Sequence, residues 1–159
     1  MSASKEGAAP LSKTPRVYVD SNVFLYAIGT EHRYRDVCQG LVRALGTRSL
    51  RGETSVETLQ EIVHHRRRRG DTDATERGRQ ALALCHTVHT LDATVALASL
   101  DLIDRHPSLP TRDAVHAATA LANGIVTVLS ADQDFDGIAG LTRVDPLDGE
   151  ATAALGSSG

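Results

Sequence analysis

The chain has 159 residues and a mass of 16.9 kDa, which suits one domain of ordinary size with its own hydrophobic core. Hydrophobic residues make up 41% and charged residues 23% of the chain, which excludes a wholly disordered protein, and no apolar run approaches the roughly 18 residues of a membrane span. The formal net charge of -3 excludes a globally basic nucleic-acid binder, although residues 64–69 read HHRRRR and residues 131–137 read ADQDFDG.

The first half of the chain predicts two strands and four helices after a short arm. Residues 1–15 are rich in Ser, Ala, Lys and Pro and lack the apolar segment of a secretory signal, so we expect a flexible N-terminal arm. Residues 16–20 (RVYVD) alternate and are β-branched, which is typical of a strand. A strand over residues 50–55 suits the order of elements, although its sequence LRGETS is polar. We expect helices over residues 23–28, 34–45 and 73–83, and one from Val56 into the arginines.

The second half continues the alternation of strands and helices. Residues 125–129 (IVTVL) form an unbroken apolar run, which is typical of a strand covered on both faces. We expect further strands over residues 87–91 and 141–144. Asp92 is the expected cap of a helix that ends before Pro107, and Thr111 that of a helix over residues 112–123. Such alternation predicts an α/β fold, a parallel sheet flanked by helices, over residues 16–147. Residues 148–159 are expected to form a flexible C-terminal tail.

The two cysteines, Cys38 and Cys85, lie within stretches of apolar periodicity. We therefore expect both to be reduced core residues. This use of cysteine favours a cytoplasmic protein over a secreted disulfide scaffold.

Acidic residues follow two of the predicted strands. Asp20 ends the first strand and Asp132 comes just after IVTVL, so both are expected at the edge where parallel α/β sheets bind ligands. Asp113 lies in the first turn of a predicted helix. Asp20 equally suits a helix N-cap, and Asp113 equally suits a helix-start acid that the helix dipole favours. For Glu61, helical spacing alone favours a solvated position beside Glu57.

Most catalytic motifs are absent from the sequence, which contains no CxxC, HExxH, GxGxxG or P-loop. The run of aspartates from Asp132 is not an EF-hand, because the twelfth position is Arg143 instead of Glu. His116 lies on nearly the same helix face as Asp113, and a structural role is favoured for it. The remaining carboxylate set suits Mg²⁺ or Mn²⁺, and two-metal sites of this kind hydrolyse phosphodiesters.

Four segments together resemble the motifs of the PIN-domain ribonucleases. Residues 18–27 (YVDSNVFLYA) are similar to the opening motif, and residues 55–62 (SVETLQEI) to the second, which selects Glu61 over Glu57. Residues 111–121 (TRDAVHAATAL) resemble the third motif and residues 128–138 (VLSADQDFDGI) the fourth. The size of the chain resembles that of the VapC toxins of bacterial toxin–antitoxin pairs.

This resemblance implies a PIN-like three-layer α/β/α fold and a divalent-metal-dependent endoribonuclease. Its catalytic and metal-binding residues would be Asp20, Glu61, Asp113 and Asp132, and Asp134 would assist them. The expected cofactor is Mg²⁺ or Mn²⁺, and the expected partners are RNA, a cognate antitoxin and a second copy of the chain, with no membrane.

Other interpretations remain open at this point. The alternatives are a catalytically inactive PIN-like module that binds RNA or protein, and a nuclease that acts on structured DNA or in ribosomal RNA processing. The run of arginines from Arg66 to Arg69 is compatible with RNA phosphates, with the antitoxin or with a solvated helix end. Arg112 suits a phosphate contact, although an ordinary ion pair is favoured.

Overall fold

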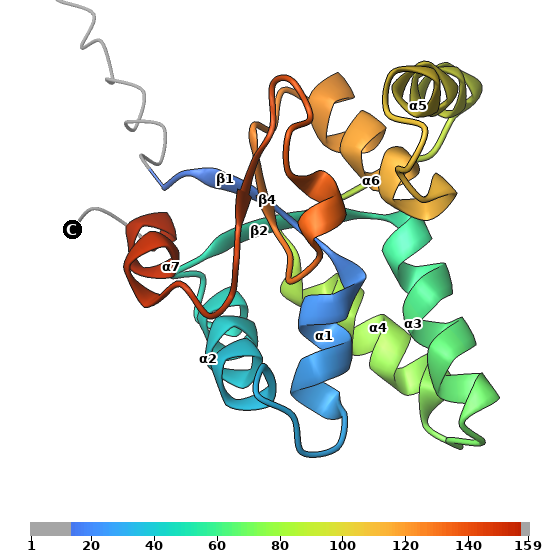
Figure 1. Ribbon diagram of the computed structural model, residues 1–159. Coiled ribbons are helices and arrows are strands. Elements are labelled where there is room, and N and C mark those ends of the chain that lie inside the picture. The colour runs from blue at the N-terminus through green and yellow to red at the C-terminus, as the bar shows by residue number, and fades with distance from the viewer. Residues whose placement is uncertain (1–13, 157–159) are drawn as a thin grey trace, which may run out of the picture.

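A parallel sheet of five strands forms the centre of the fold, in the order β3-β2-β1-β4-β5 (Figure 1). The computed structural model describes residues 14–156, so the arm expected over residues 1–15 lies almost entirely outside them. The strands are β1 (Arg16–Val19), β2 (Arg51–Ser55), β3 (Thr87–His89), β4 (Thr127–Leu129) and β5 (Thr142–Val144). The predicted parallel α/β class is confirmed.

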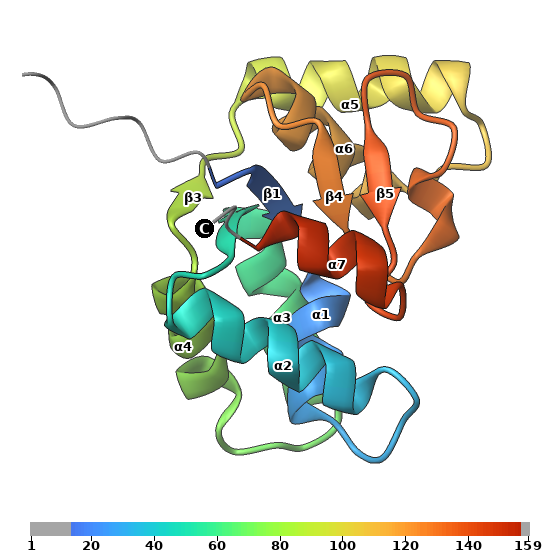
Figure 2. The same cartoon turned by 90° about the vertical axis from the view of Figure 1, so that its left-hand side faces the viewer.

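Helices cover both faces of the sheet (Figures 1 and 2). Because neighbouring side chains of a strand point to opposite faces, Val17 and Val19 of β1 pack in one core and Tyr18 in the other. The described helices are α1 (Ser21–Ile28), α2 (Arg35–Gly46), α3 (Val56–Arg68), α4 (Ala74–Leu84), α5 (Ala93–Arg105), α6 (Thr111–Ala122) and α7 (Gly149–Leu155). Helices α5 and α6 enclose the core of Tyr18, while α1, α2, α4 and α7 contribute to that of Val17. No helix within residues 14–156 is long and apolar enough to cross a membrane.

The polar strand β2 lies buried in the sheet between β1 and β3. Its Glu53 is 1% exposed, and its carboxylate accepts two hydrogen bonds from Arg16, from Nε at 2.7 Å and from Nη2 at 2.9 Å. His89 Nε2 lies 2.7 Å from the same carboxylate. Burial opposes the charge of Glu53, but these hydrogen bonds lower its pKa to about 2. The predicted strand is confirmed, and its polar residues are tolerated because they are paired.

The C-terminal segment differs from the expected flexible tail. Asp148 caps α7, because its side chain accepts the N–H of Ala151 at 3.0 Å. Leu155 at the end of α7 is 6% exposed and packs in the core, and Gly156 bridges to Leu50. The expectation of a flexible tail is therefore wrong over residues 149–156, since one apolar side chain anchors the helix. Residues 157–159 lie outside the described part of the chain.

Of the two predicted helix caps, Asp92 is confirmed and Thr111 is wrong. Asp92 caps α5 by accepting the N–H of Val95 at 2.9 Å. Thr111 does not cap α6; it is the first residue of that helix, and Pro110 occupies the cap position. The two cysteines are free and buried as predicted, and burial raises the pKa of each thiol to about 12.

Candidate metal centre

The four predicted acids come from four separate segments that meet at the carboxyl ends of β1 and β4. Asp20 follows β1, Asp132 follows β4, Glu61 lies in α3 and Asp113 lies in the first turn of α6. Ligand atoms of Asp20, Glu61 and His116 lie within 4.8 Å of one another, and so do those of Asp113, Asp132 and Asp134. The parallel topology explains why residues so far apart in the chain share one edge of the sheet.

Asp20 is both a helix cap and a member of this cluster. Its side chain is almost fully buried, and Oδ1 accepts the N–H of Ser21 at 2.7 Å at the start of α1. Oδ2 accepts a hydrogen bond from Ser130 Oγ at 2.7 Å. Burial raises the pKa of Asp20 above its ordinary value, although His116 and Ser130 counteract the shift. The two interpretations of Asp20 that the sequence left open are therefore compatible.

Ser130 connects the first and fourth acidic segments. Its hydroxyl donates to Asp20 and accepts from Asn22 Nδ2 at 3.0 Å and from the N–H of Asp132 at 2.9 Å. One small hydroxyl thus holds the loop after β4 against the start of α1. Apolar periodicity does not single out Ser130; its only signal in the sequence is its position two residues before Asp132, in the segment that resembles the fourth motif.

Glu61 is held from two sides, and its predicted solvation is wrong. Its side chain is 16% exposed, Oε2 accepts from Ser21 Oγ at 3.0 Å, and Oε1 is hydrogen-bonded to His116 Nε2. Spacing along α3 could not reveal these contacts, because both partners come from other helices. Only the resemblance to the second motif selected Glu61.

His116 forms a buried pair with Glu61. Burial disfavours the charged imidazole, but the hydrogen bond to Glu61 and the charge of Asp20 outweigh it and raise the pKa of His116. Burial likewise opposes the charge of Glu61, yet its contacts with His116 lower its pKa. On the opposite side of the ring, Nδ1 lies 2.6 Å from the Tyr18 hydroxyl. Because Glu61 contacts one ring nitrogen and Tyr18 the other, His116 is placed to orient Glu61.

The donor set of the second group suits a divalent cation. Burial, together with the charges of Asp20 and Asp132, raises the pKa of Asp113 to about 8. Asp134 lies exposed beside them, and Asp132 Oδ1 accepts its N–H at 2.9 Å. Carboxylates that repel one another in this way need a positive charge among them to be ionised together. Their oxygen atoms match the preference of Mg²⁺ and Mn²⁺.

Part of the basic run at the end of α3 is paired with acidic residues of the segment that follows it. Arg66 is 11% exposed, and its guanidinium lies 3.2 Å from both Asp71 and Asp73, while Arg69 Nε lies 3.6 Å from Asp71. Arg68 is exposed and forms no ion pair within residues 14–156. Arg112 makes the ion pair that the sequence favoured, with Nε 3.9 Å from Glu57. Part of the run therefore anchors the loop between α3 and α4.

Comparisons with known proteins agree with this geometry. The PIN domain family model matches residues 17–141. Ribonuclease VapC7 of Mycobacterium tuberculosis is 35% identical over 133 residues, which cover 82% of this chain and 91% of that protein. Ribonuclease VapC13 of the same organism is 28% identical over 132 residues, which cover 80% of this chain and 98% of that protein.

Solved structures show the same fold. The structure of Mycobacterium tuberculosis VapC20, described as a Sarcin-Ricin loop cleaving toxin, aligns with a TM-score of 0.64 and 18% identity over 77% of this chain and 95% of its own. A toxin–antitoxin complex from Klebsiella pneumoniae aligns with a TM-score of 0.59 and 22% identity over 82% of this chain and 97% of its own.

Proposed function

The chain belongs to the VapC ribonucleases of the PIN-domain family, and on that premise we propose that it cleaves RNA at the cluster of Asp20, Glu61, Asp113 and Asp132. The observation that carries the proposal is the convergence of these acids at one edge of the sheet, where burial and the charges of Asp20 and Asp132 raise the pKa of Asp113 to about 8. Such a cluster is unfavourable by itself and becomes favourable around a divalent cation. Within this proposal the enzyme is an endoribonuclease and the toxin of a toxin–antitoxin pair.

Each acid has a proposed role in this reaction. Asp113 and Asp132, from the group that includes Asp134, and Asp20, from the group with Glu61 and His116, would hold Mg²⁺ or Mn²⁺. Such an ion, when bound, lowers the pKa of a water molecule and stabilises charge on the leaving oxygen. Glu61 would orient the attacking water, because Ser21 and His116 fix its two oxygen atoms. Ser130 holds Asp20 and the backbone of Asp132 close together through its hydroxyl.

Cleavage of mixed cellular RNA tests this function. We expect the purified chain to cleave RNA with Mg²⁺ or Mn²⁺ and to lose this activity in EDTA and in the double variant Asp20→Asn/Asp113→Asn. Circular dichroism of the variant shows whether the fold survives. Cleavage that persists in chelator or in the folded double variant would contradict the proposed site. A wild-type chain that neither binds Mn²⁺ nor cleaves RNA would favour an inactive binding module.

We propose two protein partners as well. Several structural neighbours are complexes of a toxin with its antitoxin, such as that from Klebsiella pneumoniae, which supports a cognate antitoxin for this chain. A second copy of the chain is proposed from α5, which lies on the outside of the fold (Figure 2). Its Leu97 and Leu100, one helical turn apart, are 64% and 53% exposed. An apolar pair of this size is stabilised when a second copy covers it.

The homodimer predicts a specific effect of charge on α5. We expect the double variant Leu97→Glu/Leu100→Glu to be a folded monomer by light scattering coupled to gel filtration, because two buried glutamates would repel their copies across the symmetric interface. Leu147→Glu is the matched control, since Leu147 is 41% exposed outside α5 and should leave the dimer intact. A wild-type chain that is monomeric at high concentration would rule out this interface.

A further inference from the structure

The arginines at the end of α3 differ in what they contact, and two of them, Arg67 and Arg68, are exposed and form no ion pair within residues 14–156. Arg66 and Arg69 are paired with Asp71. Arg68 extends into solvent and forms no ion pair within the described residues 14–156. A cationic side chain without a partner is available to bind an anion, and of these two arginines only Arg68 lines the cavity that contains Glu61.

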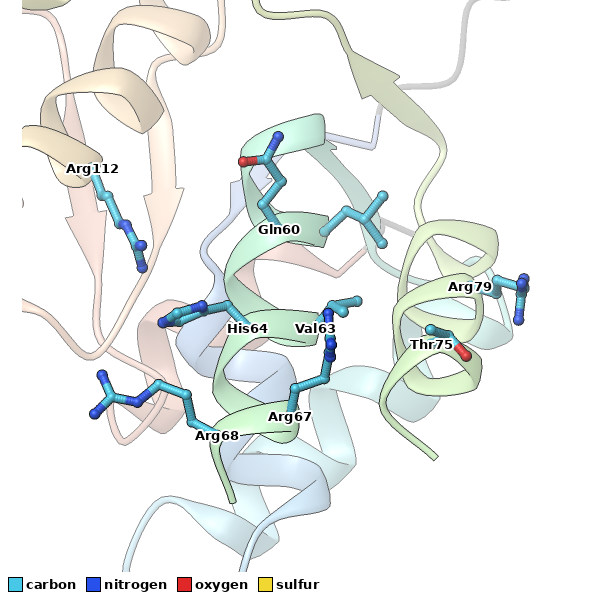
Figure 3. A pocket seen from close by; sticks show the side chains of 9 residues that line it. Gln60, Val63, His64, Arg67, Arg68, Thr75, Arg79 and Arg112 are labelled. Atoms are coloured by element: carbon cyan, nitrogen blue, oxygen red, sulfur yellow. The ribbon is translucent and has the colours of Figure 1, made fainter. Parts of the chain in front are cut away.

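Helical spacing places Arg68 on the same face of α3 as the proposed metal centre. Glu61, His64 and Arg68 follow one another at intervals of three and four residues, so their side chains lie on one side of the helix. The helical rise places Arg68 about 10 Å along the axis from Glu61. Figure 3 shows His64 and Arg68 pointing away from α4 into the space toward which Arg112 of α6 also points.

These side chains line one cavity that also contains Glu61. Its volume is about 490 Å³, and its lining includes Glu61, His64, Arg68 and Arg112. Arg112 is bonded to Asp113 in the chain, so one wall of the cavity belongs to the start of α6. The guanidinium of Arg112 is 56% exposed and lies 3.9 Å from Glu57, a long ion pair that leaves its other N–H groups free to donate. The cavity is therefore a cationic extension of the acidic centre.

We propose that Arg68 and Arg112 form a phosphate subsite, which binds the backbone phosphate of an RNA nucleotide next to the scissile bond. The inference rests on the proposed function, because it places the reacting phosphate at the acids beside Glu61. Guanidinium groups hold phosphate through paired N–H donors, and His64 adds a further polar group to the wall. The contact reads no base, so it applies to any RNA sequence.

The lining of the cavity favours RNA over an acidic protein segment. A neighbouring groove of about 790 Å³ between α3 and α4 shares Arg68 and Arg112 with this cavity, and its wall adds Arg67, Arg79 and the apolar side chains of Leu59 and Val63. Figure 3 shows Val63 on the side of α3 that faces α4. Apolar side chains of this kind suit a protein partner. The cavity beside Glu61 has Leu25 as its single aliphatic side chain, against three arginines. Binding there is thus expected to depend on charge, and it should weaken steeply with salt.

The test measures binding of a fluorescein-labelled oligouridylate to the full chain in EDTA, with a gel to show that the RNA stays intact. We expect Arg68→Gln/Arg112→Gln to weaken binding about tenfold, since charge-assisted hydrogen bonds are lost. The slope of log Kd against log salt should fall by about 0.7, because the subsite holds one phosphate and each phosphate contact of a single strand contributes about 0.7.

The matched control is Arg67→Gln/Arg79→Gln, which removes the same charge from the groove between α3 and α4. It should leave the salt slope at the wild-type value, and Mn²⁺ binding by calorimetry should be unchanged in both double variants. If both double variants lose the same affinity for oligouridylate, the effect comes from net charge alone, and the proposed subsite is overturned. Loss of antitoxin binding with unchanged RNA affinity would assign the cavity to the protein partner and overturn it too.

Failure of the subsite can be told apart from failure of the proposed function. If wild-type protein cleaves RNA in a metal-dependent way but Arg68→Gln/Arg112→Gln binds oligouridylate like the wild type, only the subsite is wrong. If the wild-type chain neither binds nor cleaves RNA, the proposed function is wrong and the subsite with it. Arg68→Lys keeps the charge but lacks the paired N–H donors of a guanidinium. Weaker binding of oligouridylate by this variant, with the wild-type salt slope, would further support paired guanidinium contacts.

Discussion

Asp113→Asn is expected to lower RNA cleavage roughly 10³-fold and yet to make the metal-free protein more stable at alkaline pH. Burial and the neighbouring charges of Asp20 and Asp132 raise the pKa of Asp113 from 3.8 to about 8. A carboxyl whose pKa is higher in the folded than in the unfolded state destabilises the fold once the pH exceeds the unfolded value. The penalty grows until the pH passes about 8. Asparagine carries no charge and avoids it.

Thermal unfolding in EDTA measures this effect. The melting temperature of Asp113→Asn should exceed that of the wild type near pH 9 by several degrees, since about 1 kcal/mol corresponds to roughly 2–4 °C in a domain of this size. The difference should shrink near about pH 4, where the unfolded chain also begins to hold the proton. Asp104→Asn, an exposed substitution in α5, serves as the control. Identical melting curves for the wild type and Asp113→Asn would show that the acids do not repel one another.

Addition of Mn²⁺ should reverse the order of stability. The wild type gains stability from any ion that binds only its folded form, whereas Asp113→Asn lacks one of the proposed ligands. The affinity of the wild type for Mn²⁺ should rise with pH up to about 8, because a proton must leave Asp113 before a metal binds. An affinity that is independent of pH over this range would count against Asp113 as a ligand.

Glu53→Gln is expected to cost about 3 kcal/mol of folding free energy, although Glu53 lies outside the metal centre. The carboxylate is buried and accepts hydrogen bonds from Arg16 while contacting His89. The amide of glutamine turns an N–H₂ group toward these donors and removes the charge that balances Arg16. The partly exposed Arg16 and the half-buried His89 thereby lose their charged partner, which is strongly destabilising.

Urea denaturation of the variant and of an exposed control, Glu76→Gln, tests this prediction. The pKa of Glu53 falls from 4.5 to about 2 on folding, so its contribution is fully present above pH 4.5 and is lost as the pH falls toward 2. The wild type should lose stability in that acidic range more steeply than Glu53→Gln. A free energy of unfolding unchanged in Glu53→Gln would show that the buried network is tolerated without stabilising the fold.

Local signals in the sequence were sufficient to predict most of the secondary structure and the position of two acids of the candidate metal centre. The alternation in RVYVD and the apolar run IVTVL predicted β1 and β4, because burial of a strand depends on its own residues. The same signals placed Asp20 and Asp132 at one edge, since parallel strands present their carboxyl ends together. The assignment of these acids as metal ligands stays a prediction.

Contacts between distant segments decided the environment of the polar residues that local signals did not predict. Helical spacing predicts a solvated Glu61, but Ser21 and His116 reach it from α1 and α6. The polar β2 is buried because Arg16 and His89 neutralise Glu53 from neighbouring strands.

The sequence by itself therefore determined the α/β fold, the order of its elements and, through resemblance to the PIN-domain family, the identity of four candidate acids. The tertiary structure alone decided which polar side chains are paired, and with them the division of the basic run into Arg66, which the fold uses, and Arg68, which it leaves exposed. The physical reason is that periodicity records whether a residue faces the core, whereas hydrogen bonds and charge pairs depend on partners far away in the chain.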